Sequence, residues 1–92
     1  MFVNISVHRV KPGKESPMID SMRRYGDAAK SSGVRSVHTL RDEKSGALVG
    51  FAIWDSKEAY EAAGPALMKA VENDDLDDWH EEQWQTFHCV EA

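Results

Sequence analysis

The stretch ALVGFAIWDSKEAY, residues 47–60, decides the fold because it joins a strand that is apolar on both sides to the start of a helix. Successive side chains of a strand point to opposite faces of a sheet. Before Asp55, apolar residues fill both sets of alternate positions: Leu48, Ala52 and Trp54 on one side, and Val49, Phe51 and Ile53 on the other. This pattern is typical of a central strand whose sheet is covered on both faces.

The residues after this strand carry the signals of a helix start. Asp55 or Ser56 can cap the free backbone amides, and Glu58 lies in the first turn, where the helix dipole favours an anion. An apolar stripe then follows at helical spacing, made of Tyr60, Ala63, Leu67 and Val71. Gly64 and Pro65 interrupt this stripe, and we expect a kink or a break of the helix there.

The beginning of the chain predicts a strand and a helix. FVNISVHRV, residues 2–10, alternates apolar with polar side chains, which is typical of a strand with one apolar face. Ser16 followed by Pro17 predicts an N-cap with proline at the first helical position, and Gly33 is a natural C-terminal stop. We therefore expect a helix over residues 17–31.

The remaining segments complete a recognisable order of elements. Residues 34–42 and 47–55 predict the two strands of a hairpin, because a short connection that contains Gly46 joins them. QWQTFHCVEA, residues 83–92, predicts a closing strand. Residues 1–92 thus form a single domain in the order strand, helix, strand, strand, helix, strand. This order predicts an α+β, ferredoxin-like βαββαβ fold with a four-stranded antiparallel sheet.

The predicted topology leaves one face of the sheet bare. Right-handed crossovers put both helices on the same face, so the other face has no cover within the chain. The apolar residues on both sides of the strand at residues 47–55 nevertheless predict that both of its faces are covered. We therefore expect a homodimer in which two sheets pack face to face. A groove between the sheet and the helices of each chain is then the natural pocket for a small-molecule ligand.

The composition argues against several classes of partner. The chain carries a net charge of -5 and has a pI near 5.2, and no basic stripe offsets this charge, so we expect no nucleic acid and no membrane partner. No apolar run approaches the roughly 18 residues of a membrane span. Cys89 is the only cysteine, which fits a reducing compartment, and Met1 leads directly into strand-like sequence. We therefore expect a cytoplasmic protein.

Three segments together resemble a known superfamily. They are the turn VKPGKE at residues 10–15, the strand VRSVHTLRD after Gly33, and FAIWDSKEAYEA at residues 51–62. The pattern covers nearly all of the chain and resembles the dimeric α+β barrel superfamily, most closely the antibiotic biosynthesis monooxygenase type of domain. The resemblance implies a dimeric α+β barrel. Members include cofactor-free oxygenases that act on aromatic polyketides or quinols, haem-degrading oxygenases, isomerases and proteins with no assigned activity.

The resemblance also identifies functional side chains that are absent. Many members place a histidine or tryptophan four residues after the alanine of the Trp-x-Ser-x-Glu-Ala motif, where this chain has Ala63. The haem-degrading branch has an iron-ligating histidine further along the helix and an asparagine on the first strand. The corresponding positions are about Ala70 and Ser6, with Asn4 one alternate step away. The chain therefore lacks the haem signature, and we expect no cofactor and no metal.

Histidines of the first two strands are the candidate catalytic residues. Imidazole titrates near neutral pH, so His8 and His38 are the candidate bases. Asn4 and Ser6 share the strand face of His8 and are candidates for binding and orienting a substrate carbonyl. The alternative is that these three side chains form a satisfied polar network or a dimer contact. His38 can equally lie at a wet sheet edge.

Aromatic residues supply the other candidate substrate contacts. Trp54 ends the central strand, and Tyr60 lies at the start of the next helix, where its phenol can donate a hydrogen bond. Trp79 and Trp84 can cap the mouth of the pocket. The alternative for Trp54 is that it only packs in the core and contacts no ligand.

The segment ENDDLDDWHEEQW, residues 72–84, holds seven carboxylates, one histidine and two tryptophans. It lacks the spacing and the central glycine of an EF-hand loop, and zinc needs more ligands than His80 alone. Because charge runs are usually solvated, we expect a wet turn that Leu76 and Trp79 pin to the body. The alternative is that the turn moves as a lid over the pocket.

The leading hypothesis is a cofactor-independent, monooxygenase-like homodimer that binds a small aromatic or quinol-type molecule. In that scheme the substrate itself reacts with oxygen once a base has removed a proton. The alternative is a non-catalytic, small-ligand-binding or stress-related dimer, which the alanines at positions 63 and 70 favour. A haem-degrading oxygenase or an isomerase ranks behind both.

Overall fold

The computed structural model describes all 92 residues and contains one four-stranded antiparallel sheet. Its elements are β1 (Phe2–His8), α1 (Glu15–Ser31), β2 (Ser36–Arg41), β3 (Leu48–Trp54), α2 (Lys57–Ala70), α3 (Leu76–Trp79) and β4 (Gln85–Val90). The strands lie in the order β2-β3-β1-β4, and every neighbouring pair is antiparallel. This arrangement confirms the predicted α+β, ferredoxin-like fold.

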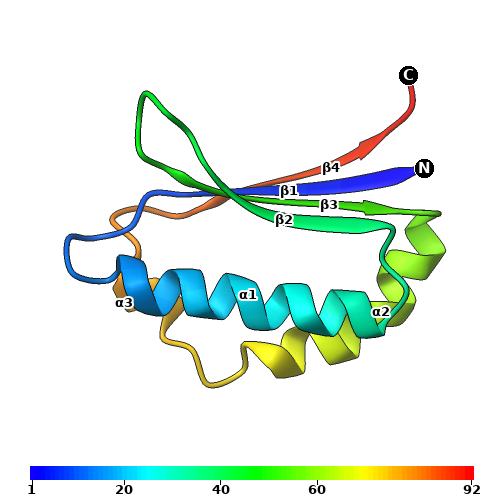
Figure 1. The fold of residues 1–92 in the computed structure, drawn as a ribbon, viewed down its shortest axis with the longest axis horizontal. Helices are drawn as coiled ribbons and strands as arrows, with labels where there is room; N and C mark the ends of the chain where they lie inside the picture. The colour runs from blue at the N-terminus through cyan, green and yellow to red at the C-terminus, as the bar shows by residue number, and fades with distance from the viewer.

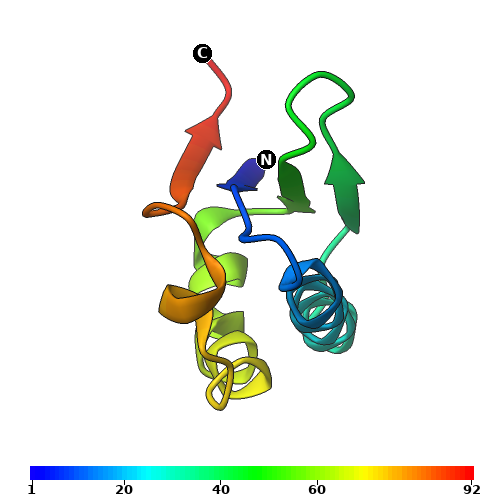
Figure 2. The ribbon, with the colours of Figure 1, turned by 90° about the vertical axis from the view of Figure 1, so that its left-hand side faces the viewer.

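Both long helices cover the same face of the sheet, as the right-handed crossovers predict. Figure 1 shows α1 and α2 below the four strands, and the end-on view of Figure 2 shows no helix on the opposite face. None of the helices combines the length and the hydropathy that a membrane span requires.

The strand register divides the residues of β1 and β3 into two sets. The set that faces the helices is buried and includes Phe2, Asn4, His8, Leu48, Ala52 and Trp54. The set on the open face is half-buried in the single chain and consists of Val3, Ile5, Val7, Val49, Phe51 and Ile53. The prediction that β3 is apolar on both sides is therefore confirmed.

Two clusters form the core between the sheet and the helices. The larger one surrounds the fully buried Trp54 and contains Phe2, Ala29, Ala52, Ala63 and Leu67. The smaller one consists of Met18, Met22 and Leu48, with Leu76 and Trp79 packed against it. The smaller cluster anchors the α3 region to the body, which confirms the predicted role of Leu76 and Trp79.

The predicted start of the first helix is wrong. α1 begins at Glu15, its N-cap residue is Lys14, and Ser16 lies inside the first turn instead of capping it. Pro17 is tolerated in this turn because the first four amides of a helix have no intrahelical partner. At the other end, Gly33 takes a φ of 89°, which confirms it as the stop signal.

Of the kink or break predicted for the second helix, the break is wrong. α2 runs without interruption from Lys57 to Ala70 and contains Pro65. The proline removes the backbone bond to the carbonyl of Glu61, but both residues are exposed, so solvent can bond that carbonyl. Ser56 does cap this helix, because its hydroxyl accepts a hydrogen bond from the amide of Ala59 at 3.1 Å.

The strand ends and the acidic segment differ in detail from the prediction. β1 ends at His8 rather than at residue 10, but Val10 still forms an antiparallel bridge with His80. The short helix α3, which the sequence did not predict, lies beside the first turn of α1 (Figure 1). This bridge and this helix carry His80 back to the end of β1.

Candidate functional site

His8, the last residue of β1, is the centre of a buried polar cluster, and only 7% of it is exposed. Its Nδ1 atom lies 2.7 Å from Nε2 of His80, and its Nε2 atom lies 2.8 Å from Oγ of Ser6. On the far side of the pair, Nδ1 of His80 lies 2.5 Å from the carbonyl oxygen of Leu76. Three consecutive hydrogen bonds therefore join these four residues.

The direction of these bonds follows from the chemistry of the groups at the ends. A carbonyl oxygen only accepts, so Nδ1 of His80 carries a hydrogen and donates it to Leu76. In a neutral imidazole the other nitrogen is then an acceptor, so Nδ1–H of His8 donates to Nε2 of His80. This leaves Nε2 of His8 to accept the hydroxyl hydrogen of Ser6. Both imidazoles thus carry their hydrogen on Nδ1.

Backbone pairing holds His80 in place. The amide of Lys11 donates to the carbonyl of Trp79 at 2.9 Å, and the amide of Glu81 donates to the carbonyl of Arg9 at 2.9 Å. These two bonds flank the bridge between Val10 and His80. His80 is only 5% exposed as a result, although carboxylates surround it in the sequence.

Trp84 covers the histidine pair. Its ring lies 6.2 Å from the His8 ring in a stacked arrangement and 4.7 Å from the His80 ring, measured between centroids. An indole face at these distances attracts an imidazolium through the cation–π interaction. The predicted contact residue Trp84 is therefore brought to the same site as His8.

Burial is the main reason why His8 stays uncharged at neutral pH. Burial, and then repulsion by the neighbouring His80, lower the pKa of His8 from 6.5 to about 4. His8 is therefore a neutral imidazole at pH 7.

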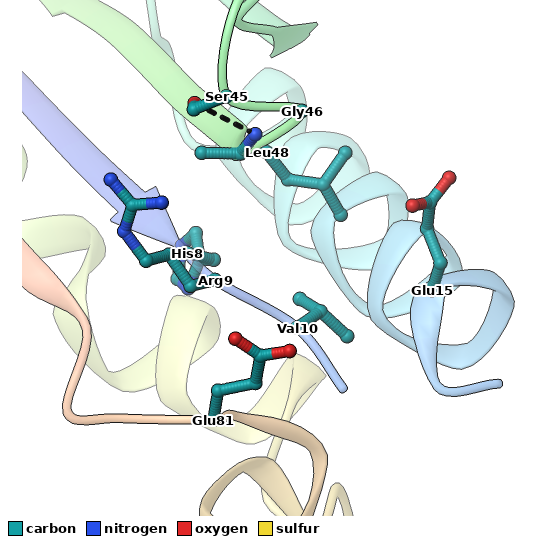
Figure 3. A pocket seen from close by; sticks show the side chains of 9 residues that line it. His8, Arg9, Val10, Glu15, Ser45, Gly46, Leu48 and Glu81 are labelled. Carbon is teal, nitrogen blue, oxygen red and sulfur yellow. Dashed lines mark hydrogen bonds between the residues drawn. The ribbon is translucent and has the colours of Figure 1, made fainter. Parts of the chain in front are cut away.

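A small cavity of about 120 Å³ opens beside His8. Figure 3 shows it between the end of β1, the first turn of α1 and the turn before β3, with Arg9, Glu15 and Glu81 around it. The guanidinium of Arg41 bonds the Glu15 carboxylate and thereby lowers the pKa of Glu15. The volume is below the roughly 300–1,000 Å³ of most ligand pockets. It is close to the roughly 150 Å³ of an engineered cavity that holds benzene.

Three other predicted contact residues gather elsewhere. Nε1–H of the buried Trp54 donates to Oδ1 of Asn4 at 2.9 Å. The ring of Tyr60 lies edge-on to Trp54 with centroids 5.8 Å apart. Beside them, burial and then the nearby Tyr60 raise the pKa of Tyr25 to about 12. Four residues of strand, or roughly 13 Å, separate Asn4 from His8, so this aromatic cluster is distinct from the histidine pair.

His38 lies on the other face of the sheet from His8. In the strand register His38 is opposite Phe51, whereas His8 is opposite Leu48, and Phe51 and Leu48 point to opposite faces. His38 is exposed on the edge strand β2. The two candidate bases therefore do not meet within one chain.

Basic residues pair with three of the seven carboxylates of the acidic segment. Arg24 bonds both carboxylate oxygens of Asp74, at 2.8 and 2.9 Å. Ion pairs also join Arg9 to Glu82 at 3.2 Å, and Lys11 and Lys14 to Asp78 at 3.9 Å each. Most of these groups are exposed, as expected for a wet turn.

Trp79 lies against the α1 side of this turn, away from His8, where it lines a shallow depression with Pro17 and Arg23. No group of three or more metal-ligating side chains is found.

Comparisons with known proteins identify the fold. Neither a family model nor a curated protein matches the sequence. Rv0793 from Mycobacterium tuberculosis superposes with a TM-score of 0.84 at 14% identity, over 99% of this chain and 94% of that one. A candidate antibiotic biosynthesis monooxygenase from Caulobacter crescentus gives 0.80 at 11% identity, over 99% and 89%. Another from Nitrosomonas europaea gives 0.76 at 15% identity, over 99% and 98%.

The chain has the fold of the antibiotic biosynthesis monooxygenase type of domain. At these identities the likeness concerns the fold alone, and the residues of the site must be judged from their own geometry. Within this fold, Ala63 is buried in the larger core cluster at 5% exposure and brings no functional group to the site.

Two residues of this site were not predicted from the sequence. His80 was included in a solvated turn, although Leu76, four residues earlier, and Trp79 interrupt the charges there and signal a buried side. Gly50 was not singled out. A Cβ atom at this position would lie 2.7 Å from Oγ of Ser6, so glycine leaves the room that the Ser6 hydroxyl occupies. A glycine inside a strand signals such a close approach.

Proposed function

We propose that this protein is a homodimeric, monooxygenase-like enzyme that removes a proton from a small quinol or phenol and lets the resulting anion react with dioxygen. The observation that carries the proposal is His8, a buried and uncharged imidazole beside a cavity of single-ring size. A neutral imidazole accepts a proton at Nε2, the nitrogen that Ser6 contacts. The fold shared with monooxygenase-type structures is consistent with this chemistry.

The proposed reaction needs only the substrate and dioxygen. His8 takes the proton of a quinol hydroxyl, and the electron-rich anion adds dioxygen at a ring carbon, so that a C–O bond forms. The O–O bond then breaks, the ring carbon loses its hydrogen, and the departing oxygen takes two protons and leaves as water. One quinol and one dioxygen thus give one hydroxylated quinone and one water, and the quinol supplies all four electrons. The protein contributes the base and the orientation of the substrate.

The open face of the sheet supports the homodimer part of the proposal. Leu40 and Phe87 are 48% and 47% exposed on this face, beside the half-buried row that includes Phe51. Contiguous apolar surface of this kind marks an interaction site. A second copy of the chain presents the same surface and covers the face by two-fold symmetry.

Oxygen uptake with single-ring hydroquinones tests the activity. We expect one dioxygen consumed per quinol and one ¹⁸O atom from ¹⁸O₂ in the product. Uncatalysed oxidation gives hydrogen peroxide and an unlabelled quinone instead, which catalase and mass spectrometry distinguish. His8→Gln should lower kcat about 100-fold or more. If His38→Gln loses activity while His8→Gln keeps full activity, the base is His38 on the open face, and the proposal is wrong.

A non-catalytic binding protein is the second candidate. The buried Ala63 and the small size of the cavity favour it, because they leave few groups to act on a substrate. This candidate predicts a retained small molecule in native mass spectrometry of the protein from its source, and no uptake of dioxygen with any quinol.

A further inference from the structure

The proposed function uses Nε2 of His8 and leaves a second buried histidine without a role. His80 lies 72 positions further along the chain, yet its Nε2 atom is 2.7 Å from Nδ1 of His8. Buried polar groups need partners, but Leu76 already satisfies one nitrogen of His80, and Ser6 satisfies one nitrogen of His8. These contacts alone do not explain why the hydrogen bonds continue without a gap from Ser6 to Leu76.

We propose that His8 and His80 form a proton relay, in which His80 fixes the tautomer of His8 and receives the proton that the substrate loses. This inference rests on the proposed function for the source of the proton. His80 is then a positioning residue and the terminal acceptor, whereas His8, which lines the cavity, takes the proton from the substrate and Ser6 orients its Nε2 atom.

Every step of the relay transfers one hydrogen and leaves the bonding otherwise unchanged. The substrate hydroxyl replaces Ser6 as the donor to Nε2 of His8 and gives its proton to that nitrogen. Nδ1–H of His8 then passes its hydrogen to Nε2 of His80. At the end Ser6 and His8 are neutral, and His80 is an imidazolium that still donates Nδ1–H to Leu76.

The surroundings favour the positive charge on His80 over His8. The Trp84 ring lies 4.7 Å from His80 and 6.2 Å from His8, so the cation–π attraction is stronger at His80. The carbonyl of Leu76 also stabilises the cation through its hydrogen bond. Repulsion between the rings and burial oppose a charge on His8.

The other charged groups near the pair are already partnered. Arg9, at the end of β1, pairs with Glu82, and Glu15, on α1, pairs with Arg41 at the end of β2. Glu81 follows His80 directly and faces the same cavity as His8. This carboxylate is the one charged neighbour without an ion pair, and a carboxylate stabilises a nearby imidazolium.

Gly50 leaves room for the Ser6 hydroxyl that orients His8. It stands opposite Ser6 in the register of β1 and β3, and a Cβ atom there would lie 2.7 Å from Oγ of Ser6 and 3.5 Å from Cε of Met22. Glycine therefore allows the hydroxyl to point at His8 from a tightly packed strand.

Nitrogen NMR of histidine-labelled full-length protein tests the relay without reference to turnover. Free neutral imidazole prefers the Nε2–H tautomer, so Nδ1–H on both His8 and His80 at neutral pH is diagnostic. His38→Gln and His88→Gln remove the signals of the two histidines outside the relay and complete the assignment. On acidification, His80 should hold both hydrogens before His8 does. An Nε2–H tautomer at either ring, or His8 as the first cation, would overturn the relay.

Two variants separate positioning from proton acceptance. In His80→Gln an amide oxygen can still accept from Nδ1–H of His8 but cannot take the proton, so the His8 tautomer should persist while kcat with quinols falls about 100-fold. Ser6→Ala should keep both tautomers and lower kcat less than His80→Gln does, because Ser6 only orients Nε2 of His8. If His80→Gln keeps the kcat of the wild type, the relay is contradicted. A wild-type protein with the expected tautomers and no quinol oxidation instead overturns the proposed function and leaves the hydrogen-bonded relay supported.

Discussion

A Cβ atom added to Gly50 would lie 2.7 Å from the hydroxyl oxygen of Ser6, on the neighbouring strand. Real Cβ atoms do not approach other atoms this closely, so Gly50→Ala must displace the Ser6 side chain. We expect a loss of about 1–3 kcal/mol in the free energy of unfolding from overpacking, together with a broken bond from Ser6 to His8. Urea unfolding at a fixed protein concentration measures the loss.

The control is the same substitution in a Ser6→Gly background. Without the serine hydroxyl the new methyl group has room, so Gly50→Ala should cost much less there. Equal losses in both backgrounds would mean that Ser6 is not what the methyl group meets.

Asn4 and Trp54 form a buried pair whose two members should be energetically coupled. Trp54 is 0% exposed, so Asn4→Ala leaves its indole N–H buried without an acceptor. We expect the free energy of unfolding to fall by about 1–3 kcal/mol. Trp54→Phe removes the same bond, so the double variant should lose less than the sum of the single ones. A double-mutant cycle from urea unfolding should give a coupling of about 0.5–3 kcal/mol. Pairing Asn4→Ala with Met68→Ala, at an exposed site on α2, should be additive.

Stability should depend on pH through His8. Its pKa is about 4 in the folded chain and near 6.5 in the unfolded chain, so the unfolded chain binds the proton first as the pH falls. The full stability is therefore present above pH 6.5 and decreases between pH 6.5 and 4, by at most about 3 kcal/mol. Unfolding measured across this window should show a shallower decrease in His8→Gln than in the wild type. Parallel curves would contradict the assignment to His8.

The open face of the sheet should hold the dimer together. Phe87→Glu places a charge on this face at a position that is 47% exposed in the single chain, so the fold of each chain should survive. Sedimentation equilibrium at micromolar concentration should then give the mass of one chain, whereas the wild type gives that of two. Met68→Glu is the matched control, because Met68 is 67% exposed on α2 and faces away from the sheet. A monomeric wild type, or dissociation in the control, would refute a dimer through this face.

Much of the fold could be predicted from the sequence because its signals are local. The two-sided apolar pattern of residues 48–54, the cap at Ser56 and the stop at Gly33 depend only on neighbours along the chain. Together with the right-handed crossover rule, they predict the strand order and the bare face of the sheet. The rule that proline breaks a helix has exceptions at exposed positions. Pro65 lies on the exposed side of α2, and the break predicted there was wrong.

The composition of the site was decided only by tertiary structure. Alternation along β1 put Asn4, Ser6 and His8 on one face, but it could not say that Asn4 would bond Trp54 while Ser6 bonds His8. Nor could it bring His80 to His8 across 72 positions, since backbone pairing with Val10 and packing of Leu76 on Met18 and Met22 achieve that. Periodicity reports which way a side chain points. Its partner depends on which distant segments are packed against it, and that is a property of the folded chain.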